Sequence, residues 1–345
     1  MSNYKYFPLI KTRDAELKAL SKLDAEYFSD TLPIYELTKS RKAKIAPDGD
    51  IHRRMETIKE IQGGRPFILD LTSNEKYINP QIEQLLNESN GFSEWQYFVD
   101  FYNELNIIPM VHVYDDDDFS QVEEFVRVMS LKKNYLAVRL PYDLDGYRKY
   151  IAPIVYNLNE NCKIYVILDG GQATSDNTNE IATSVSCACE ELDEFNRSVE
   201  DIIFISTSFP LNPRSYGEDD YGDIPILEEA IYQDIYKSYP VKYGDYASIN
   251  IEQVEIRGGV FVPRIDIALD NYFMYKRYRR NEGSYALCAR KIIADERYKS
   301  LNIWADTEIK LAAADLPSGI SPSFWIAVRM NYFMTSRILL RRADS

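Results

Sequence analysis

Short apolar runs recur along the first 270 residues, and polar stretches with a helical period separate them. The runs are rich in β-branched and aromatic residues and are almost continuously apolar, as is typical of strands buried on both faces. Seven of these runs lie at residues 6–10, 33–38, 67–72, 108–114, 135–141, 163–171 and 201–209. We expect an eighth strand in either 246–251 or 263–269.

The alternation of strand and helix patterns predicts parallel βαβ units. Successive runs lie roughly 27 to 45 residues apart, which suits a (β/α)8 barrel. A doubly wound open sheet is the alternative, but it would carry a glycine-rich turn after an early strand, and the sequence has none there. The sequence therefore predicts an α/β, TIM-barrel-like fold. We expect Gly244, Asp245 and Tyr246 to lie near the entry to the last strand.

The pattern changes after about residue 270. Residues 272–280 (YFMYKRYRR) are aromatic and basic, and we interpret them as the surface of a helix. The segments that follow are mostly of helical period, with Pro317 and Pro322 as breaks. The sequence predicts two parts, a barrel over residues 1–270 and a mainly helical extension over 271–345 that packs on it, because so short a segment lacks a comfortable core of its own.

Composition narrows the class of protein. Of the 345 residues, 45% are hydrophobic and 27% are charged, which is ordinary for a soluble globular chain. No apolar run is long enough to cross a membrane, and the first residues become charged too early for a secretory signal, so we expect a cytoplasmic protein. A net charge of −14 disfavours sequence-blind coating of nucleic acid, which needs an excess of lysine and arginine.

Charged or polar residues stand near the ends of nearly all the predicted strands: Lys11, Glu36, Asp70, His112, Arg139, Asp169 and Thr207. Five of them follow an aliphatic residue by two positions, as Glu36 follows Ile34, and a period of two places both residues on one face of a strand. If that face points inward, the polar side chains form a ring at the carboxyl-terminal mouth, where active sites of this fold lie. A purely structural ion-pair network is the alternative that these residues leave open.

The types of charge in the ring suggest a chemistry. The carboxylates of Glu36, Asp70 and Asp169 are candidate ligands for Mg or Mn. Lys11, His112 and Arg139 can hold a phosphate. Metal-assisted phosphodiester hydrolysis would use both sets, with His112 as general acid or base. The catalytic candidates are Glu36, Asp70, His112, Arg139 and Asp169.

The order of several short motifs resembles the Beta-protein family of phages and bacteria. The motifs are PLIKTRDAELKAL, LPIYELT, FILDLT, LAVRLP, VILDGG, STSFP and KYGDY, followed by a closing stretch with Trp325 and Arg329. In that closing stretch Tyr332 and Phe333 stand where the family commonly has a histidine. The matched positions include Lys11, Ser208, Asp245 and Tyr246, which with Thr207 are candidate ligand-binding residues.

The resemblance implies a cytoplasmic, barrel-like protein with a place in phage defence or counter-defence, and it implies no particular substrate. Two functions remain open from the residues. The first is a charged pocket at the barrel mouth that binds or hydrolyses a phosphorylated small molecule or a nucleic-acid ligand. The second is a non-enzymatic subunit of a defence complex that recognises a protein or nucleic-acid partner, for which residues 272–280 could stack bases or dock a partner.

Overall fold

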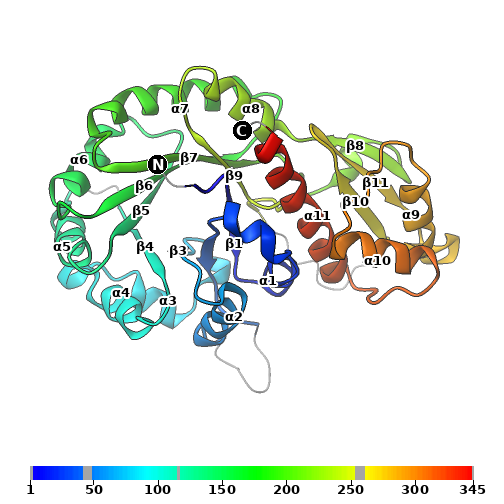
Figure 1. Cartoon of the computed structure of the whole chain (residues 1–345), viewed down its shortest axis with the longest axis horizontal. Coiled ribbons are helices and arrows are strands. Elements are labelled where there is room, and N and C mark those ends of the chain that lie inside the picture. The colour runs from blue at the N-terminus through cyan, green and yellow to red at the C-terminus, as the bar shows by residue number, and fades with distance from the viewer. Residues whose placement is uncertain (1–2, 42–48, 115–116, 253–260, 344–345) are drawn as a thin grey trace.

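The computed structural model describes residues 3–41, 49–114, 117–252 and 261–343. Eight parallel strands close into a barrel in the order β1-β2-β3-β4-β5-β6-β7-β9. Their bounds are β1 (Tyr6–Lys11), β2 (Ile34–Leu37), β3 (Phe67–Leu71), β4 (Ile107–Val111), β5 (Tyr135–Pro141), β6 (Lys163–Gln172), β7 (Val199–Thr207) and β9 (Lys242–Asp245). The predicted TIM-barrel-like α/β fold is confirmed, and Figure 1 shows the helices wrapped around the strands.

Helices connect the strands on the outside of the barrel, as the helical periods predict. They are α1 (Asp14–Ser21), α2 (His52–Gln62), α3 (Pro80–Leu85), α4 (Ser89–Phe101), α5 (Ser120–Met129), α6 (Arg148–Tyr156), α7 (Thr178–Leu192) and α8 (Leu227–Tyr236). Short 3-10 turns are η1 (Ala25–Asp30), η2 (Glu75–Tyr77), η3 (Asp193–Phe195), η4 (Pro213–Tyr216) and η5 (Arg280–Glu282). No described helix is long and apolar enough to cross a membrane.

The last barrel strand differs from both predicted candidates. It is β9, only four residues long, and it ends at Asp245, so the segment Gly244–Tyr246 marks the exit of the last strand and not its entry. Gly244 is required there by a close approach, because a Cβ atom would lie 2.4 Å from the carbonyl oxygen of Phe7 on β1. A strand with a glycine and two charged residues among its four positions has no apolar run for a sequence pattern to detect.

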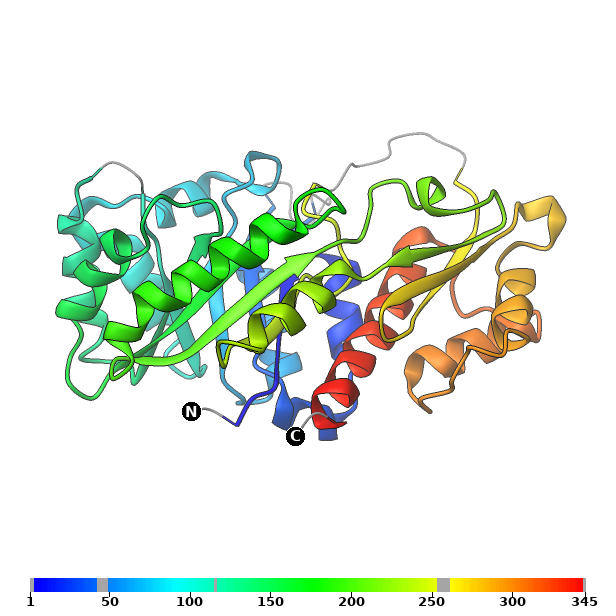
Figure 2. The same cartoon turned by 90° about the horizontal axis from the view of Figure 1, so that it is seen from above.

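A small antiparallel sheet lies beside the barrel. Its strands, in the order β10-β11-β8, are β10 (Arg264–Ala268), β11 (Tyr272–Arg277) and β8 (Tyr221–Pro225). The chain therefore leaves the barrel after β7 to form β8, returns through α8 to β9, and leaves again for β10. Figure 2 shows this sheet and the barrel side by side. The interpretation of residues 272–280 as a helix surface is wrong for 272–277, whose buried Phe273, Met274 and Tyr275 form the middle of β11.

Three helices complete the C-terminal segment: α9 (Ser284–Ile293), α10 (Trp304–Ala313) and α11 (Pro322–Ala343). The predicted helical character of this segment is confirmed. Helix α11 lies between the barrel and the small sheet (Figure 1), where it contacts both α1 and β10. Because it is covered on opposite sides, it buries Arg329 and Arg337 as well as apolar residues. Arg329 pairs with Asp266 of β10 at 3.2 Å, and Arg337 pairs with Glu229 of α8 at 3.1 Å.

The basic side chains of β11 are paired with acidic ones. Lys276 lies 3.3 Å from Asp295, and Arg277 lies 3.9 Å from Asp219 and donates a hydrogen bond to its carbonyl oxygen. These pairs neutralise two of the four basic residues that suggested a nucleic-acid or protein partner for residues 272–280. The partner itself remains a prediction from the sequence.

Candidate functional site

Five of the predicted strand-end side chains come together at the carboxyl ends of the barrel strands. They are Glu36, Asp70, His112, Arg139 and Asp169, carried by β2 to β6 or by the position directly after β4. The aliphatic residues two positions earlier belong to one buried cluster inside the barrel: Ile34, Ile68, Met110, Ala137 and Ile167. The two-residue period of the strands therefore carries the five polar side chains to the same mouth.

Arg139 lies at the centre of this group and contacts three carboxylates. Its Nη1 atom donates a hydrogen bond to Glu36 Oε2 over 3.1 Å and lies 3.1 Å from Asp70 Oδ2. Its Nε atom lies 3.7 Å from Asp169 Oδ2. Burial alone would lower the pKa of Arg139, but the carboxylates of Asp70 and Glu36 more than offset this and raise it well above its ordinary value. We refer to Glu36, Asp70, Arg139 and Asp169 as the Arg139 cluster; its guanidinium stays charged.

Further donors fix the carboxylates of the Arg139 cluster. The Leu71 amide donates to Asp70 Oδ1 over 2.8 Å, and the Gly171 amide donates to Asp169 Oδ1 over 2.9 Å. The Tyr246 hydroxyl donates to Asp169 Oδ2 over 2.6 Å. Tyr246 was a candidate from its motif, but the amide donors were not expected. The Asp-Gly-Gly order is a usable signal for one of them, because Gly171 has a φ of +59° that favours glycine.

The pKa of Asp70 is raised and the pKa of His112 is lowered. Burial raises the pKa of Asp70 to about 6, Arg139 opposes this, and Glu36 reinforces it. His112 Nδ1 lies 3.9 Å from Asp70 Oδ1, and its ring packs against Trp95 and Phe92. Burial, together with the charge of Arg139, lowers the pKa of His112 to about 3. His112 is therefore a neutral imidazole near pH 7, and Asp70 changes its charge within reach of that pH.

Lys11 occupies the end of β1 at the same mouth. Its ammonium donates a hydrogen bond to the carbonyl oxygen of Ile251 over 3.1 Å, and burial lowers its pKa. The charges of Glu36 and Arg139 both act on it, which places it near the Arg139 cluster. Within the described parts of the chain it has no carboxylate partner at ion-pair distance. Lys11 is thus a buried cation whose charge the nearby acids do not pair directly.

The structure does not bring Ser208 and Asp245 to the cluster. Ser208 donates from its amide and its hydroxyl to Glu228 of α8, outside the barrel. Asp245 accepts from the Tyr6 hydroxyl over 2.7 Å, and the Tyr6 ring belongs to the core between strands and helices. Thr207 is fully buried, and its hydroxyl accepts a hydrogen bond from the Phe209 amide. Of the candidates that the family motifs added, only Tyr246 reaches the Arg139 cluster.

The three carboxylates predicted as metal ligands do not fit that role. Mg²⁺ lies about 2.1 Å from its oxygen ligands, and Ca²⁺ about 2.4 Å. Here the guanidinium of Arg139 lies between Glu36, Asp70 and Asp169 at 3.1 to 3.7 Å. No group of three or more acidic, histidine or cysteine side chains among the described residues is arranged to hold a metal ion. The carboxylate oxygens that would have to ligate the metal instead surround the guanidinium of Arg139.

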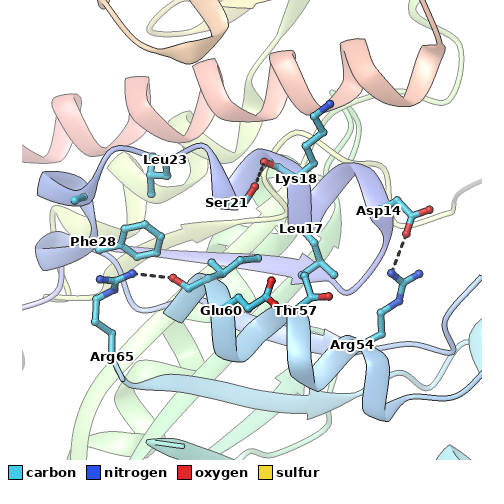
Figure 3. Close-up of a pocket in the computed structure, with 12 residues that line it drawn as sticks. Asp14, Leu17, Lys18, Ser21, Leu23, Phe28, Arg54, Thr57, Glu60 and Arg65 are labelled. Atoms are coloured by element: carbon cyan, nitrogen blue, oxygen red, sulfur yellow. Dashed lines mark hydrogen bonds and ion pairs between the residues drawn. The ribbon is translucent and has the colours of Figure 1, made fainter. Parts of the chain in front are cut away.

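A groove of about 540 Å³ lies on the outside of the barrel, between α1, η1 and α2 (Figure 3). Its floor is apolar, with the buried Leu17, Phe28 and Ile61. At one end Arg54 pairs with Asp14 over 2.8 Å, and at the other Arg65 stacks 4.1 Å over the Phe28 ring and donates to the Ile61 carbonyl oxygen. No sequence pattern predicts this groove, because it depends on how separate elements pack against each other. Its cations are paired or stacked.

Comparison with known proteins adds a family and one relative. The profile of the Beta protein family matches residues 6–338. "Protein beta" of Enterobacteria phage P4 is 28% identical over an alignment of 348 positions, which covers 99% of this chain and 95% of that protein. Among solved structures, the spore cortex-lytic enzyme SleL of Bacillus megaterium QM B1551 matches with a TM-score of 0.34 and 12% identity, over 96% of this chain and 74% of that one.

Proposed function

This chain belongs to the Beta protein family, and from that premise we propose that it acts in the conflict between phages and bacteria by binding a phosphorylated ligand at the mouth of its barrel. The role in conflict is supported by the relative from phage P4, which matches almost end to end. The ligand is a phosphorylated small molecule or the phosphorylated end of a nucleic acid.

The observation that carries the proposal is that the Arg139 side chain is held by carboxylates but stays partly exposed. Three carboxylates hold its guanidinium, yet 18% of the Arg139 side chain remains exposed, whereas Glu36 and Asp70 keep only 6% and 5%. The Arg139 side chain is therefore more accessible to a ligand that enters the mouth than these two carboxylates are. A planar guanidinium with a fixed orientation matches the oxygens of a phosphoryl group, and Lys11 adds a second cation nearby.

Replacing Arg139 with lysine is the test of this binding. The substituted side chain would keep one positive charge but lose the fork that binds two oxygens at once, so we expect affinity to fall about tenfold, or ~1.4 kcal/mol. Binding is measured by calorimetry with inorganic phosphate, a nucleoside monophosphate and a short 5′-phosphorylated oligonucleotide. The unphosphorylated oligonucleotide is the negative probe, and Arg290→Lys, at an exposed pair with Asp315, is the control variant.

The outcomes separate cleanly. Binding of at least one phosphorylated probe to the natural protein, weakened in Arg139→Lys and unchanged in Arg290→Lys, supports the proposal. If none of the three probes binds, the proposal that the ligand is phosphorylated is overturned. Equal affinity of the natural protein and a folded Arg139→Lys protein overturns the role of Arg139. Folding of both variants is checked by thermal melting.

The role in conflict has its own measurement. The natural protein and Arg139→Lys are expressed in a bacterial host, and the plating efficiency of a panel of phages is compared with that on cells without the protein. We expect the natural protein to raise or lower plating of some phages, and Arg139→Lys to lose that effect at equal protein level. Unaltered plating of every phage in cells that contain the natural protein would contradict the proposed role.

A further inference from the structure

We propose that the barrel mouth binds the phosphoryl group of its ligand without a divalent cation, because the guanidinium of Arg139 occupies the position that the cation would take. This inference rests on the proposed function and specifies how the same site recognises its ligand. Arg139 is the group that touches the phosphoryl oxygens. Glu36, Asp70 and Asp169 are positioning residues that hold it.

The first support is the distances. One atom of Arg139, Nη1, lies 3.1 Å from carboxylate oxygens of both Glu36 and Asp70. These are ordinary lengths for charge-assisted hydrogen bonds and ion pairs. A divalent cation shared by the same two oxygens would stand within about 2.5 Å of each, in the space that Nη1 fills. Cation and guanidinium therefore exclude each other sterically as well as by repulsion.

The second support is that groups of the protein itself already hold Asp169 and Asp70 in place. Asp169 accepts from Tyr246 and from the Gly171 amide, and Asp70 accepts from the Leu71 amide. The elements that face Asp70 contribute Glu36 from β2, Arg139 from β5 and Asp169 from β6, with the neutral His112 after β4. Arg139 is the one positive side chain within ion-pair distance of these three carboxylates in the described residues.

The third support is that Arg139 has a larger exposed fraction than the carboxylates of the cluster. In a site built for a metal, the carboxylates point toward the ligand and the metal lies between them and the phosphate. Here 18% of the Arg139 side chain is exposed, against 14% for Asp169, 6% for Glu36 and 5% for Asp70. An incoming phosphoryl group therefore meets a cation that belongs to the protein. Because the charge is covalently attached, the site needs no free metal ion to become complementary to an anion.

Removal of one carboxylate charge distinguishes an arginine-centred site from a metal-centred site, because phosphate affinity changes in opposite directions in the two. In Glu36→Gln, the amide oxygen can still accept the hydrogen bond from Arg139, while one negative charge near the bound anion is gone. An arginine-centred site then binds phosphate equally well or more tightly, by about threefold or more at an effective dielectric constant near 20. A metal-centred site loses one of its ligands and binds far more weakly. Asp169→Asn is a second variant with the same two forecasts. The asparagine oxygen can still accept from Tyr246, while the hydrogen bond from the Gly171 amide is lost.

The experiment is calorimetry on the full chain. MgCl₂ and MnCl₂ are first titrated alone, and we expect no binding at the mouth. The tightest of the three phosphorylated probes is then titrated in EDTA and in MgCl₂ into the natural protein, Glu36→Gln and Asp169→Asn, with Glu104→Gln, an exposed acid paired with Lys59, as control. Thermal melting verifies that each variant is folded.

Each outcome supports or overturns the inference. Equal affinity in EDTA and MgCl₂, with unchanged or tighter binding in Glu36→Gln, supports it. Binding that disappears in EDTA and returns with Mg²⁺ or Mn²⁺ overturns it, and so does loss of binding in both folded variants; the proposed function survives either result. Failure of every probe with the natural protein, with and without metal, instead overturns the proposed function on which the inference rests.

Discussion

Replacement of Arg337 by methionine is expected to lower the free energy of unfolding by about 3–5 kcal/mol, the usual cost of removing one partner from a buried ion pair. Arg337 has no exposed surface. It pairs with Glu229 of α8 at 3.1 Å and donates to the carbonyl oxygens of Asp270 and Leu269 over 2.8 and 2.6 Å. Methionine fills much of the volume but leaves these two carbonyl groups without the arginine donor. Glu229 keeps Arg341 as its cationic partner and a hydrogen bond from Gln233.

The matched control is Arg290→Met. Arg290 makes a two-bonded pair with Asp315, but both side chains are largely exposed, so its loss should cost less than about 1 kcal/mol. Both variants are unfolded with urea and followed by circular dichroism. A stability for Arg337→Met within about 1 kcal/mol of the natural protein would contradict the idea that this arginine ties α11 to the barrel.

The burial of Arg337 in helix α11 cannot be recognised from the sequence. Helix α11 has polar and apolar residues on all sides, because it is covered by the barrel on one side and by the small sheet on another. A pattern search looks for one apolar stripe and treats arginine as exposed. Nothing local indicates that Arg337 ends against an acid 108 positions earlier in the chain. Such pairs are decided by tertiary packing.

The barrel itself was predictable for the opposite reason. Its first seven strands are buried on both faces, so their sequences are apolar over nearly their whole length and stand out from the helical periods between them. β9 and β8 each have only four or five residues and carry charges, and the local pattern is too weak to detect them. β11 carries three consecutive buried residues followed by two basic ones, a composition that fits a helix surface as well as a strand in a small sheet.

At the candidate site, the two-residue period was more reliable than the family motifs. Ile203 and Ile205 point into the barrel, so Thr207 continues that face and Ser208 takes the other one. Ser208 does lie outside, against Glu228, although its motif made it a candidate ligand contact. The period could not show that Arg139 would reach three carboxylates at once, because that depends on side-chain conformations across five neighbouring strands.

The second large effect is expected for Glu228→Gln, whose stability relative to the natural protein should increase as the pH rises. Glu228 has no exposed surface; its Oε2 accepts from the Ser208 amide over 2.9 Å and from the Ser208 hydroxyl, while its Oε1 has no hydrogen-bond partner in the described structure. Burial raises the pKa of Glu228 from 4.5 to about 7, against the opposing effect of the Ser208 hydrogen bonds. The folded state therefore binds the proton more tightly than the unfolded state does.

The sign of the effect follows from that difference. A group whose pKa is raised on folding stabilises the protein fully below the unfolded pKa, and this contribution is lost as the pH rises through the folded pKa. For Glu228 the loss falls between about pH 4.5 and pH 7, and a shift of this size corresponds to about 3 kcal/mol. Glutamine has no such transition. Because a small part of this loss already lies below pH 5, we expect the stability of Glu228→Gln relative to the natural protein to rise by about 2.5 kcal/mol between pH 5 and pH 8.

Urea unfolding of both proteins at pH 5 and at pH 8 measures this difference. Any constant cost of the new amide group cancels when the two pH values are compared. Glu104→Gln, at an exposed pair with Lys59, is the control and should show the same stability difference at both pH values. Asp70, whose pKa burial also raises to about 6, titrates in both proteins and drops out of the comparison. A difference between Glu228→Gln and the natural protein that stays constant from pH 5 to pH 8 would show that Glu228 is already ionised in the folded protein, and that its two hydrogen bonds from Ser208 outweigh its burial.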